Sequence, residues 1–186
     1  MGFALAEACA ERGAEVTLVA GPVSLKTHHP AIKRIDVESA GEMYQAAMTA
    51  FPSSDAAILC AAVADYRPEN ASEQKIKRET EGEMTLHLVP NPDIAASLGA
   101  IKREGQVMVG FALETNDEAT HAEGKLKRKN LDFIVLNSLR DQGAGFRCDT
   151  NKITIIDNAG GVTSYPLKTK REVACDIVNK LVTLLK

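Results

Sequence analysis

The sequence predicts an α/β protein with a doubly wound, mainly parallel sheet, helices on both faces and an added C-terminal β-hairpin. Three observations support this fold class. Short apolar stretches of strand length alternate with longer stretches of helical periodicity, as in βαβ units. A helical stretch at residues 1–12 is followed by a glycine and a strand, which is the second half of such a unit. Near the C-terminus, two alternating stretches flank Asn158-Ala159-Gly160, which is typical of a hairpin.

Length and composition set limits on the function. A chain of 186 residues can bury one sizeable core. The net charge of −3 and the aromatic content of 4%, without tryptophan, argue against a nucleic-acid partner. The four cysteines include no C-x-x-C pair, and Cys9 and Cys60 lie in apolar patterns, which predicts buried free thiols in a reducing compartment. No signal peptide and no apolar run of about 18 residues is present, so we expect a cytoplasmic protein that does not enter membranes.

Hydrophobic periodicity and capping residues predict the helices and strands along the chain. Ser39 and Glu42 form a capping box at the start of one helix, and Asn91, with Pro92 after it, is the predicted N-cap of another. Asn130 is expected to close the helix before it. The predicted helices are 1–12, 39–51, 91–103, 117–129 and 170–185, and the predicted strands are 14–20, 32–37, 55–64, 84–89, 106–113, 131–136, 151–157 and 161–166.

The stretch after the third strand is the main candidate for function. Residues 56–64 are wholly apolar, which predicts a strand buried on both faces. Its carboxyl end delivers Asp65 and Arg67 to the sheet edge where open α/β folds bind ligands. Lys75 follows in a polar segment, and an acid facing a mobile basic segment suits a metal-complexed polyphosphate. A solvated loop after a core strand explains the same pattern equally well.

Three further features are weaker candidates. Lys125 and Lys129 lie four residues apart on one helix face, where they can clamp successive phosphates. Cations near a helix C-terminus are also favoured by the helix dipole alone. The free backbone amides at Pro92–Ala95 can hold an anion, although capping alone explains this segment. Phe111, at a strand end, is more often a core residue than a ligand contact.

Six motifs in order carry a resemblance to a known family. Together they resemble the bacterial phosphopantothenate–cysteine ligase domain, the synthetase half of the bifunctional coenzyme A biosynthesis flavoprotein. The resemblance covers essentially the whole chain and implies a Rossmann-like sheet. The motifs are Ala61-Ala62-Val63-Ala64-Asp65-Tyr66-Arg67, Lys75-Ile76-Lys77, Asn91-Pro92-Asp93-Ile94, Gly110-Phe111-Ala112-Leu113-Glu114-Thr115, residues 125–130, and Gly145-Phe146 with Asp149-Thr150-Asn151.

The resemblance implies an activity and its partners. The family joins 4′-phosphopantothenate to L-cysteine at the expense of CTP, through an acyl-cytidylate, and releases CMP and pyrophosphate. Such enzymes work as homodimers and require a divalent cation, Mg²⁺ or Mn²⁺. FMN is expected only if a decarboxylase domain precedes this chain.

The resemblance also assigns roles to residues. Lys75 is the implied catalytic residue, which neutralises charge as pyrophosphate leaves, and Asp65 is the implied metal ligand. Residues 1–186 form one ligase domain, with a mobile flap at 65–83 and a hairpin at 143–166 as a possible dimerisation element. The implied CTP-binding residues are Asp65, Lys75, Pro92, Asp93, Ile94, Ala95, Phe111, Lys125 and Lys129.

One departure from the family keeps other functions open. The family's first strand and Gly-rich turn do not precede Met1, so we expect this chain to bind CTP better than it catalyses ligation. A truncated NAD(P)-dependent oxidoreductase is one alternative, although Ala20-Gly21-Pro22 stand where that fold places an acid for the ribose. A non-catalytic nucleotide-binding or dimerisation module is another.

Overall fold

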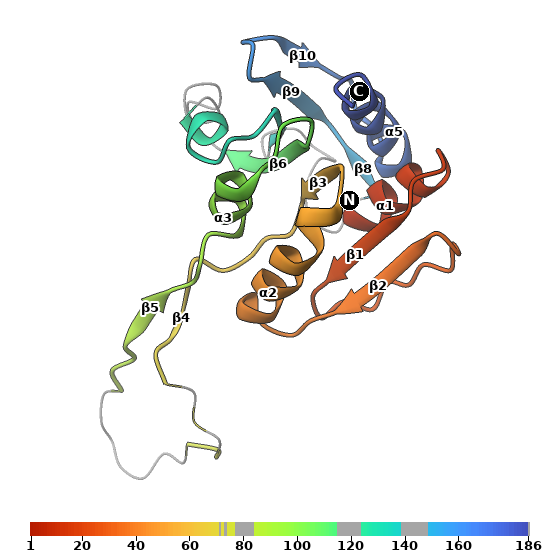
Figure 1. Ribbon diagram of the computed structural model, residues 1–186. Coiled ribbons are helices and arrows are strands. Elements are labelled where there is room, and N and C mark those ends of the chain that lie inside the picture. The colour runs from red at the N-terminus through yellow and green to blue at the C-terminus, as the bar shows by residue number, and fades with distance from the viewer. Residues whose placement is uncertain (71, 73, 77–83, 115–123, 139–148, 186) are drawn as a thin grey trace.

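A computed structural model describes residues 1–70, 72, 74–76, 84–114, 124–138 and 149–185. Figure 1 shows a layered body of strands and helices, from which one thin ribbon projects far to one side. The predicted α/β class is confirmed. No helix among the described residues is long and apolar enough to cross a membrane.

The main sheet has five strands in the order β10-β9-β7-β6-β3. Strands β3, β6 and β7 come first in the chain and are parallel, because the connections between them cross over through helices. The predicted hairpin is confirmed, and it extends this sheet because β9 pairs antiparallel with β7. The strands are β3 (Ala56–Leu59), β6 (Val107–Glu114), β7 (Phe133–Ser138), β9 (Ile153–Asp157) and β10 (Val162–Ser164).

A second parallel pair lies beside the main sheet. Strands β1 (Val16–Ala20) and β2 (Ile32–Asp36) pair in register, and helix α1 (Gly2–Ala10) leads into β1 through Gly13. Gly13 has a φ of +87°, which glycine adopts without the strain that other residues incur. Within the described chain, no hydrogen-bonded ladder joins β1 to β3. The sequence did not predict this division of the sheet.

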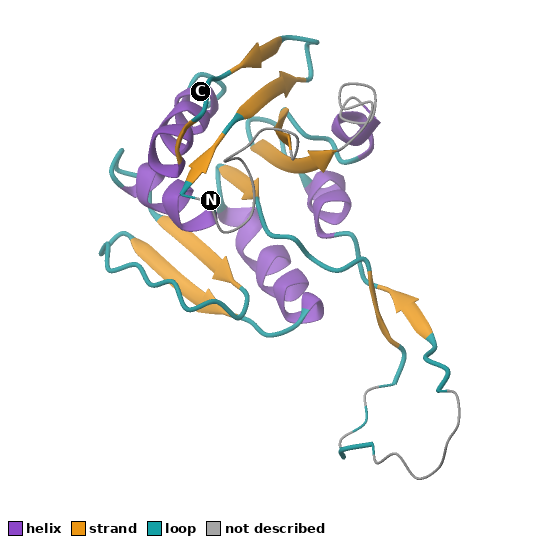
Figure 2. Ribbon diagram, turned by 180° about the vertical axis from the view of Figure 1, so that it is seen from behind, coloured by secondary structure: helices purple, strands orange, loops and turns teal. Residues whose placement is uncertain are grey.

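Helices cover both faces of the main sheet (Figures 1 and 2). Alternate residues of β6 supply the two cores: Val107 and Val109 contact one face, and Met108 contacts the other. Helices α1 and α5 (Lys170–Val182) cover the first face. The second face is covered by α2 (Ala40–Ala50), the short helix η1 (Phe51–Ser53), α3 (Ile94–Ile101) and helical residues 124–128.

Two strand predictions need correction. The strand expected at 55–64 ends at Leu59 and is half-buried, because β3 is an edge strand whose one ladder partner among the described residues is β6. The strand expected at 84–89 lies at β5 (Leu88–Pro90), which pairs antiparallel with β4 (Tyr66–Pro68). The other strands and helices lie within a few residues of their predicted ranges, apart from those that fall outside the described residues. A last short ladder joins β8 (Thr150–Asn151) to β11 (Lys168–Thr169).

The predicted capping box at α2 is only half formed. The Ser39 hydroxyl accepts a hydrogen bond from the Glu42 backbone N–H at 3.1 Å, as expected. The Glu42 carboxylate, however, accepts from the N–H of Glu38 rather than from that of Ser39. A complete capping box occurs at α5, between Thr169 and Glu172. The hairpin's suggested part in dimerisation stays a prediction, and residues 143–148 lie outside the described residues.

Replacing Asp132 should test how the α3 layer is attached to the sheet. Its Oδ2 accepts hydrogen bonds from the Met108 N–H and from Lys102 Nζ, both at 2.6 Å. We expect Asp132→Ala to lower the free energy of unfolding by about 2 kcal/mol, because a buried N–H loses its acceptor. Urea unfolding measures this. Arg171→Ala, which breaks an exposed pair with Glu11, should cost under about 0.5 kcal/mol. Equal losses in the two variants would contradict this account.

Candidate functional site

The start of helix α3 is organised around Asp93. Its carboxylate Oδ1 accepts a hydrogen bond from the Ala96 N–H at 3.0 Å, so Asp93 is the N-cap. The prediction that Asn91 caps this helix, with Pro92 in its first turn, is therefore wrong. Both residue types favour the N-cap position, and Asn91 is engaged elsewhere.

Asn91 ties the helix start to the segment that contains Asp65. Its side-chain Nδ2 donates to the carbonyl of Ala64 at 2.9 Å, and its backbone N–H donates to the carbonyl of Asp65 at 2.8 Å. Arg67 adds a hydrogen bond from Nη1 to the carbonyl of Pro90 at 2.8 Å. Asp65 thus lies beside the helix start although strand β3 ends well before it. These contacts, rather than a continuous strand, place its exposed carboxylate.

Lys129 reaches the same helix start from another element. Its Nζ lies 3.0 Å from Oδ2 of Asp93. Partial burial alone raises the pKa of Asp93, but the amides of Ala96 and Ala95 and the Lys129 ammonium outweigh it and hold that pKa below its ordinary value. Lys125 lies one turn earlier, where its carbonyl accepts the N–H of Lys129 at 3.0 Å. The structure therefore brings Asp65, Asp93, Lys125 and Lys129 into one region.

Gly99 fixes the distance between α3 and the turn that carries Lys129. A Cβ atom at Gly99 would lie 2.2 Å from the carbonyl oxygen of Lys129, which no real side chain tolerates. Asn130 closes the preceding helix as predicted, with a φ of +51°, and its Nδ2 donates to the carbonyl of Gly99 at 3.0 Å. Gly99 was not among the residues predicted from the sequence. A glycine inside a predicted helix was the available signal.

Two predicted site residues lie apart from this region. Phe111 packs against the core on the α1 and α5 face, opposite the face that α3 covers. The described segment 74–76, which contains Lys75, lies on the projecting ribbon (Figure 1) and is exposed. Of the remaining predicted residues, Pro92 is exposed at the helix start, Ala95 is half-buried, and Ile94 packs into the α3 core. Their contact with a ligand stays a prediction.

The arrangement is suited to binding an anion. Backbone amides at a helix start and two lysines on a neighbouring turn all favour negative charge. A phosphate oxygen can take the place of the Asp93 carboxylate as the partner of Lys129. Within the described ranges, no three His, Cys, Asp or Glu side chains gather to hold a metal ion. Asp65 can supply a carboxylate ligand to Mg²⁺. The nucleotide phosphates would supply the further oxygen ligands, as is usual where Mg²⁺ binds together with a nucleotide.

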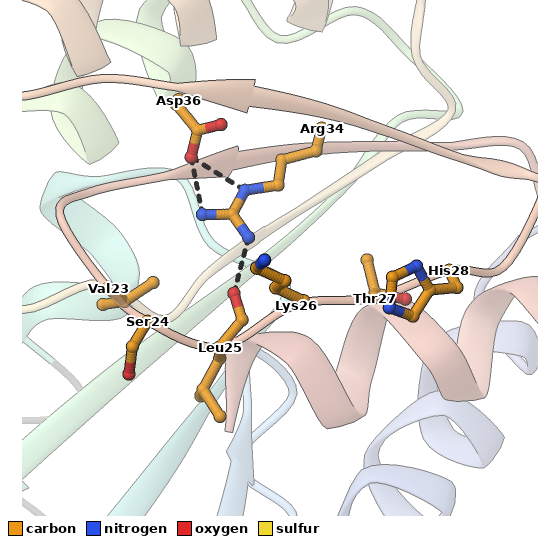
Figure 3. Close-up of a pocket in the computed structure, with 8 residues that line it drawn as sticks. All are labelled: Val23, Ser24, Leu25, Lys26, Thr27, His28, Arg34 and Asp36. Atoms are coloured by element: carbon orange, nitrogen blue, oxygen red, sulfur yellow. Dashed lines mark hydrogen bonds and ion pairs between the residues drawn. The ribbon is translucent and has the colours of Figure 1, made fainter.

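A separate hollow of about 360 Å³ lies between the 23–28 loop and strand β2 (Figure 3). The Arg34 guanidinium lines it, but this group already pairs with Asp36 at 2.6 Å and stacks over the Phe3 ring at 5.4 Å. His28 also lines the hollow. No predicted site residue is among its lining residues.

Relatives of known family assign the chain to a family. Residues 1–185 match the family described as the DNA/pantothenate metabolism flavoprotein C-terminal domain. The chain belongs to this family. A "Cysteine/Cysteine sulfinic acid decarboxylase" from an unknown prokaryotic organism is 57% identical over the whole chain, which covers 51% of that protein. The "Coenzyme A biosynthesis bifunctional protein CoaBC" of Vibrio parahaemolyticus is 46% identical over the whole chain, which covers 46% of that protein.

A solved structure gives the same assignment. The crystal structure of the C-terminal domain of a coenzyme A biosynthesis bifunctional protein CoaBC aligns with a TM-score of 0.81 and 33% identity, covering 98% of this chain and 81% of that one. The chain spans about half the length of the curated relatives it matches. It therefore corresponds to the C-terminal domain of the bifunctional proteins, and the family resemblance seen in its motifs is confirmed.

Gly99→Ala should test the close approach of α3 to the Lys129 turn. We expect a loss of about 2–3 kcal/mol in the free energy of unfolding, because the backbone of Lys129 must move to admit the methyl group. Gly41→Ala is the matched control, since its Cβ would meet nothing closer than 3.9 Å, and it should be neutral or gain up to about 1 kcal/mol. Denaturant unfolding compares them. A Gly99→Ala protein as stable as wild type would contradict the close packing.

Asp93→Asn should separate the charge of Asp93 from its capping role. Asparagine still caps a helix, so we expect a cost of only about 0.5–1 kcal/mol at neutral pH, from the partly exposed ion pair. The pKa of Asp93 is depressed, so this advantage of wild type is complete above the ordinary carboxyl pKa of about 3.9. It is lost as pH falls through the lower pKa of the folded state.

Stability curves measured against pH check this linkage. The wild-type and Asp93→Asn curves should converge in acid. Asp93→Ala also loses the helix cap, so it should be about 1 kcal/mol less stable than Asp93→Asn over the whole pH range. A gap between wild type and Asp93→Asn that does not change with pH would show that the charge is not the cause.

Proposed function

We propose that this chain catalyses the CTP-dependent ligation of 4′-phosphopantothenate with L-cysteine, within coenzyme A biosynthesis. The structural observation that carries the proposal is the convergence of the α3 start, the Asp65 segment and Lys129 at one sheet edge. Family membership supports the same assignment, because relatives that match the whole chain include coenzyme A biosynthesis proteins.

The reaction has two balanced steps. In the first, a carboxylate oxygen of 4′-phosphopantothenate attacks the α-phosphorus of CTP, the bond to the β-phosphate oxygen breaks, and pyrophosphate leaves. In the second, the cysteine amine attacks the acyl carbon of the acyl-cytidylate, CMP leaves with the electron pair of the broken C–O bond, and the amine loses a proton. The products are 4′-phosphopantothenoylcysteine, CMP and pyrophosphate.

The residues near the α3 start suit the first step. Lys129 and Lys125 bind the phosphates, and the amides of the first turn of α3 add partial positive charge. Asp65 holds the Mg²⁺ or Mn²⁺ that accompanies the nucleotide. Lys75 lies apart from the α3 start, and only the family resemblance assigns to it the neutralisation of the charge that develops as pyrophosphate leaves.

Ligand-dependent stabilisation tests nucleotide choice. With Mg²⁺ present, we expect CTP to raise the melting temperature of the chain more than ATP or NAD(P)H does, because only a ligand bound to the folded state stabilises it. Pyrophosphate release that requires CTP, 4′-phosphopantothenate and cysteine together tests the ligase reaction. A larger shift with NAD(P)H would instead favour an oxidoreductase.

Lys129→Gln should weaken CTP binding while leaving the fold intact. We expect the dissociation constant for CTP to rise about tenfold or more, since a charge-assisted contact with phosphate is lost. Lys127→Gln is the control, because Lys127 lies in the same helical segment and is exposed, and it should bind CTP like wild type. Calorimetric titration measures both. Equal affinities for the two variants would remove Lys129 from the proposed site.

A further inference from the structure

The turn at residues 129–132, which carries Lys129, is fixed to strand β6 at its far end. The Asp132 backbone N–H donates to the Met108 carbonyl at 2.8 Å, and the Asp132 carboxylate accepts the Met108 N–H at 2.6 Å. Leu131, beside Asp132, is 4% exposed in the core that α3 covers. These contacts hold the end of the turn that is further from Lys129. The end that carries Lys129 is held by α3.

The last turn of α3 and the residue after it contact the near end of this turn. The close approach of Gly99 to the Lys129 carbonyl oxygen puts the two backbones in direct contact. Asn130 donates from Nδ2 to the Gly99 carbonyl at 3.0 Å. Lys102 donates from Nζ to the Asn130 carbonyl at 3.2 Å and to Asp132 Oδ2 at 2.6 Å. Lys102 therefore joins the residue next to Lys129 to the residue that is bonded to β6.

The burial of Lys102 indicates that this bridge is its main role. Its side chain is 11% exposed and that of Asp132 is 20% exposed. A charge is costly to bury unless it is paired and hydrogen-bonded, so both groups depend on each other. A lysine that only balanced the dipole at the end of α3 would serve equally well in solvent. The ammonium is instead held over the turn, where it has two acceptors.

Lys102 is too far from the start of α3 to touch a ligand there. The eight residues of α3 separate it from Asp93, a rise of about 12 Å at about 1.5 Å per residue. Lys129 spans most of this length, because its carbonyl lies against Gly99 while its Nζ lies 3.0 Å from Oδ2 of Asp93. The Lys129 side chain thus runs along α3 from its last turn towards its first. A displacement of the Lys129 backbone would carry its ammonium along the helix.

We propose that Lys102 and Asn130 are positioning residues, which set the height of Lys129 along α3 and so the place where its ammonium meets a nucleotide phosphate. This role rests on the proposed function, because it requires that Lys129 bind the nucleotide. Helix α3 acts as a rigid spacer between a buried ion pair at its end and a more exposed pair at its start. The exposed pair of Lys129 with Asp93 can exchange the carboxylate for a phosphate. The buried pair stays closed, since opening it would leave an unpaired charge.

Lys102→Met tests the bridge, because methionine keeps an unbranched side chain and removes the ammonium. We expect the dissociation constant for CTP, measured by calorimetry with Mg²⁺, to rise about fivefold, because Lys129 is no longer held at one height. Lys180→Met is the matched control. Lys180 pairs with Asp157 at 2.9 Å and has a side chain 31% exposed, and it belongs to α5, on the opposite face of the sheet from α3. This variant should unfold at a lower denaturant concentration and bind CTP like wild type.

A double-mutant cycle separates positioning from a general loosening of the fold. In a Lys129→Gln background, Lys102→Met should change the dissociation constant for CTP by less than about twofold, since the side chain that it positions is absent. Affinities are compared well below the unfolding midpoint of each variant. The same fivefold weakening in both backgrounds would show that Lys102 acts independently of Lys129, and it overturns the proposal. Wild-type affinity in a folded Lys102→Met protein also overturns it.

Asn130→Gly tests the same link without leaving a buried charge unpaired. Glycine adopts the φ of +51° freely and keeps the carbonyl that Lys102 contacts, but it loses the bond to Gly99. We expect the dissociation constant for CTP to rise about two- to threefold. Should Lys102→Met fail to fold, wild-type affinity in Asn130→Gly overturns the proposal by itself. A wild-type chain that does not bind CTP contradicts the proposed function, whereas wild-type binding with unaffected variants contradicts the positioning role alone.

Discussion

Strand β6 is the constraint on which the rest of the structure depends. It pairs in parallel with β3 on one edge and β7 on the other, and its residues Val109 and Met108 are wholly buried beneath helices on opposite faces. A shift of one residue would move each side chain of β6 into the opposite core, which is packed around different side chains, so the register is fixed. Gly110 lies in this strand where a Cβ atom would meet the Leu131 side chain at 2.6 Å. All three parallel strands consequently end at the same edge.

Polar contacts at that edge hold the residues of the proposed site in position. Strand β3 stops early, and the chain beyond it is held by the side chain and the backbone of Asn91 rather than by a ladder. Asp93 then serves both as N-cap of α3 and as partner of Lys129. A bound phosphate would compete with Asp93 for this lysine, so the ion pair keeps the cation in place in the absence of ligand. The arrangement is prepared for an anion without leaving an uncompensated charge.

Much of the fold could be predicted from local patterns, and the failures have specific causes. Alternation and capping residues identified the hairpin and the turn at Asn130, because these depend on neighbours in sequence. The length of β3 could not be predicted, since the apolar composition of 56–64 does not reveal which residues find a ladder partner. Asn91 and Asp93 are equally good caps by residue type, and the non-local bonds from Asn91 to Ala64 and Asp65 distinguish them. Gly99 was missed for the same reason, because its constraint comes from Lys129.

The central claim is that a nucleotide binds at the α3 start. Hydrogen exchange, measured by mass spectrometry with and without CTP and Mg²⁺, tests this claim most directly. Amides exchange more slowly where a ligand suppresses local opening. The account predicts slower exchange at residues 91–98 and 125–131, with little change in the 23–28 loop beside the separate hollow. Protection confined to that loop and β2, with none at the α3 start, would contradict it.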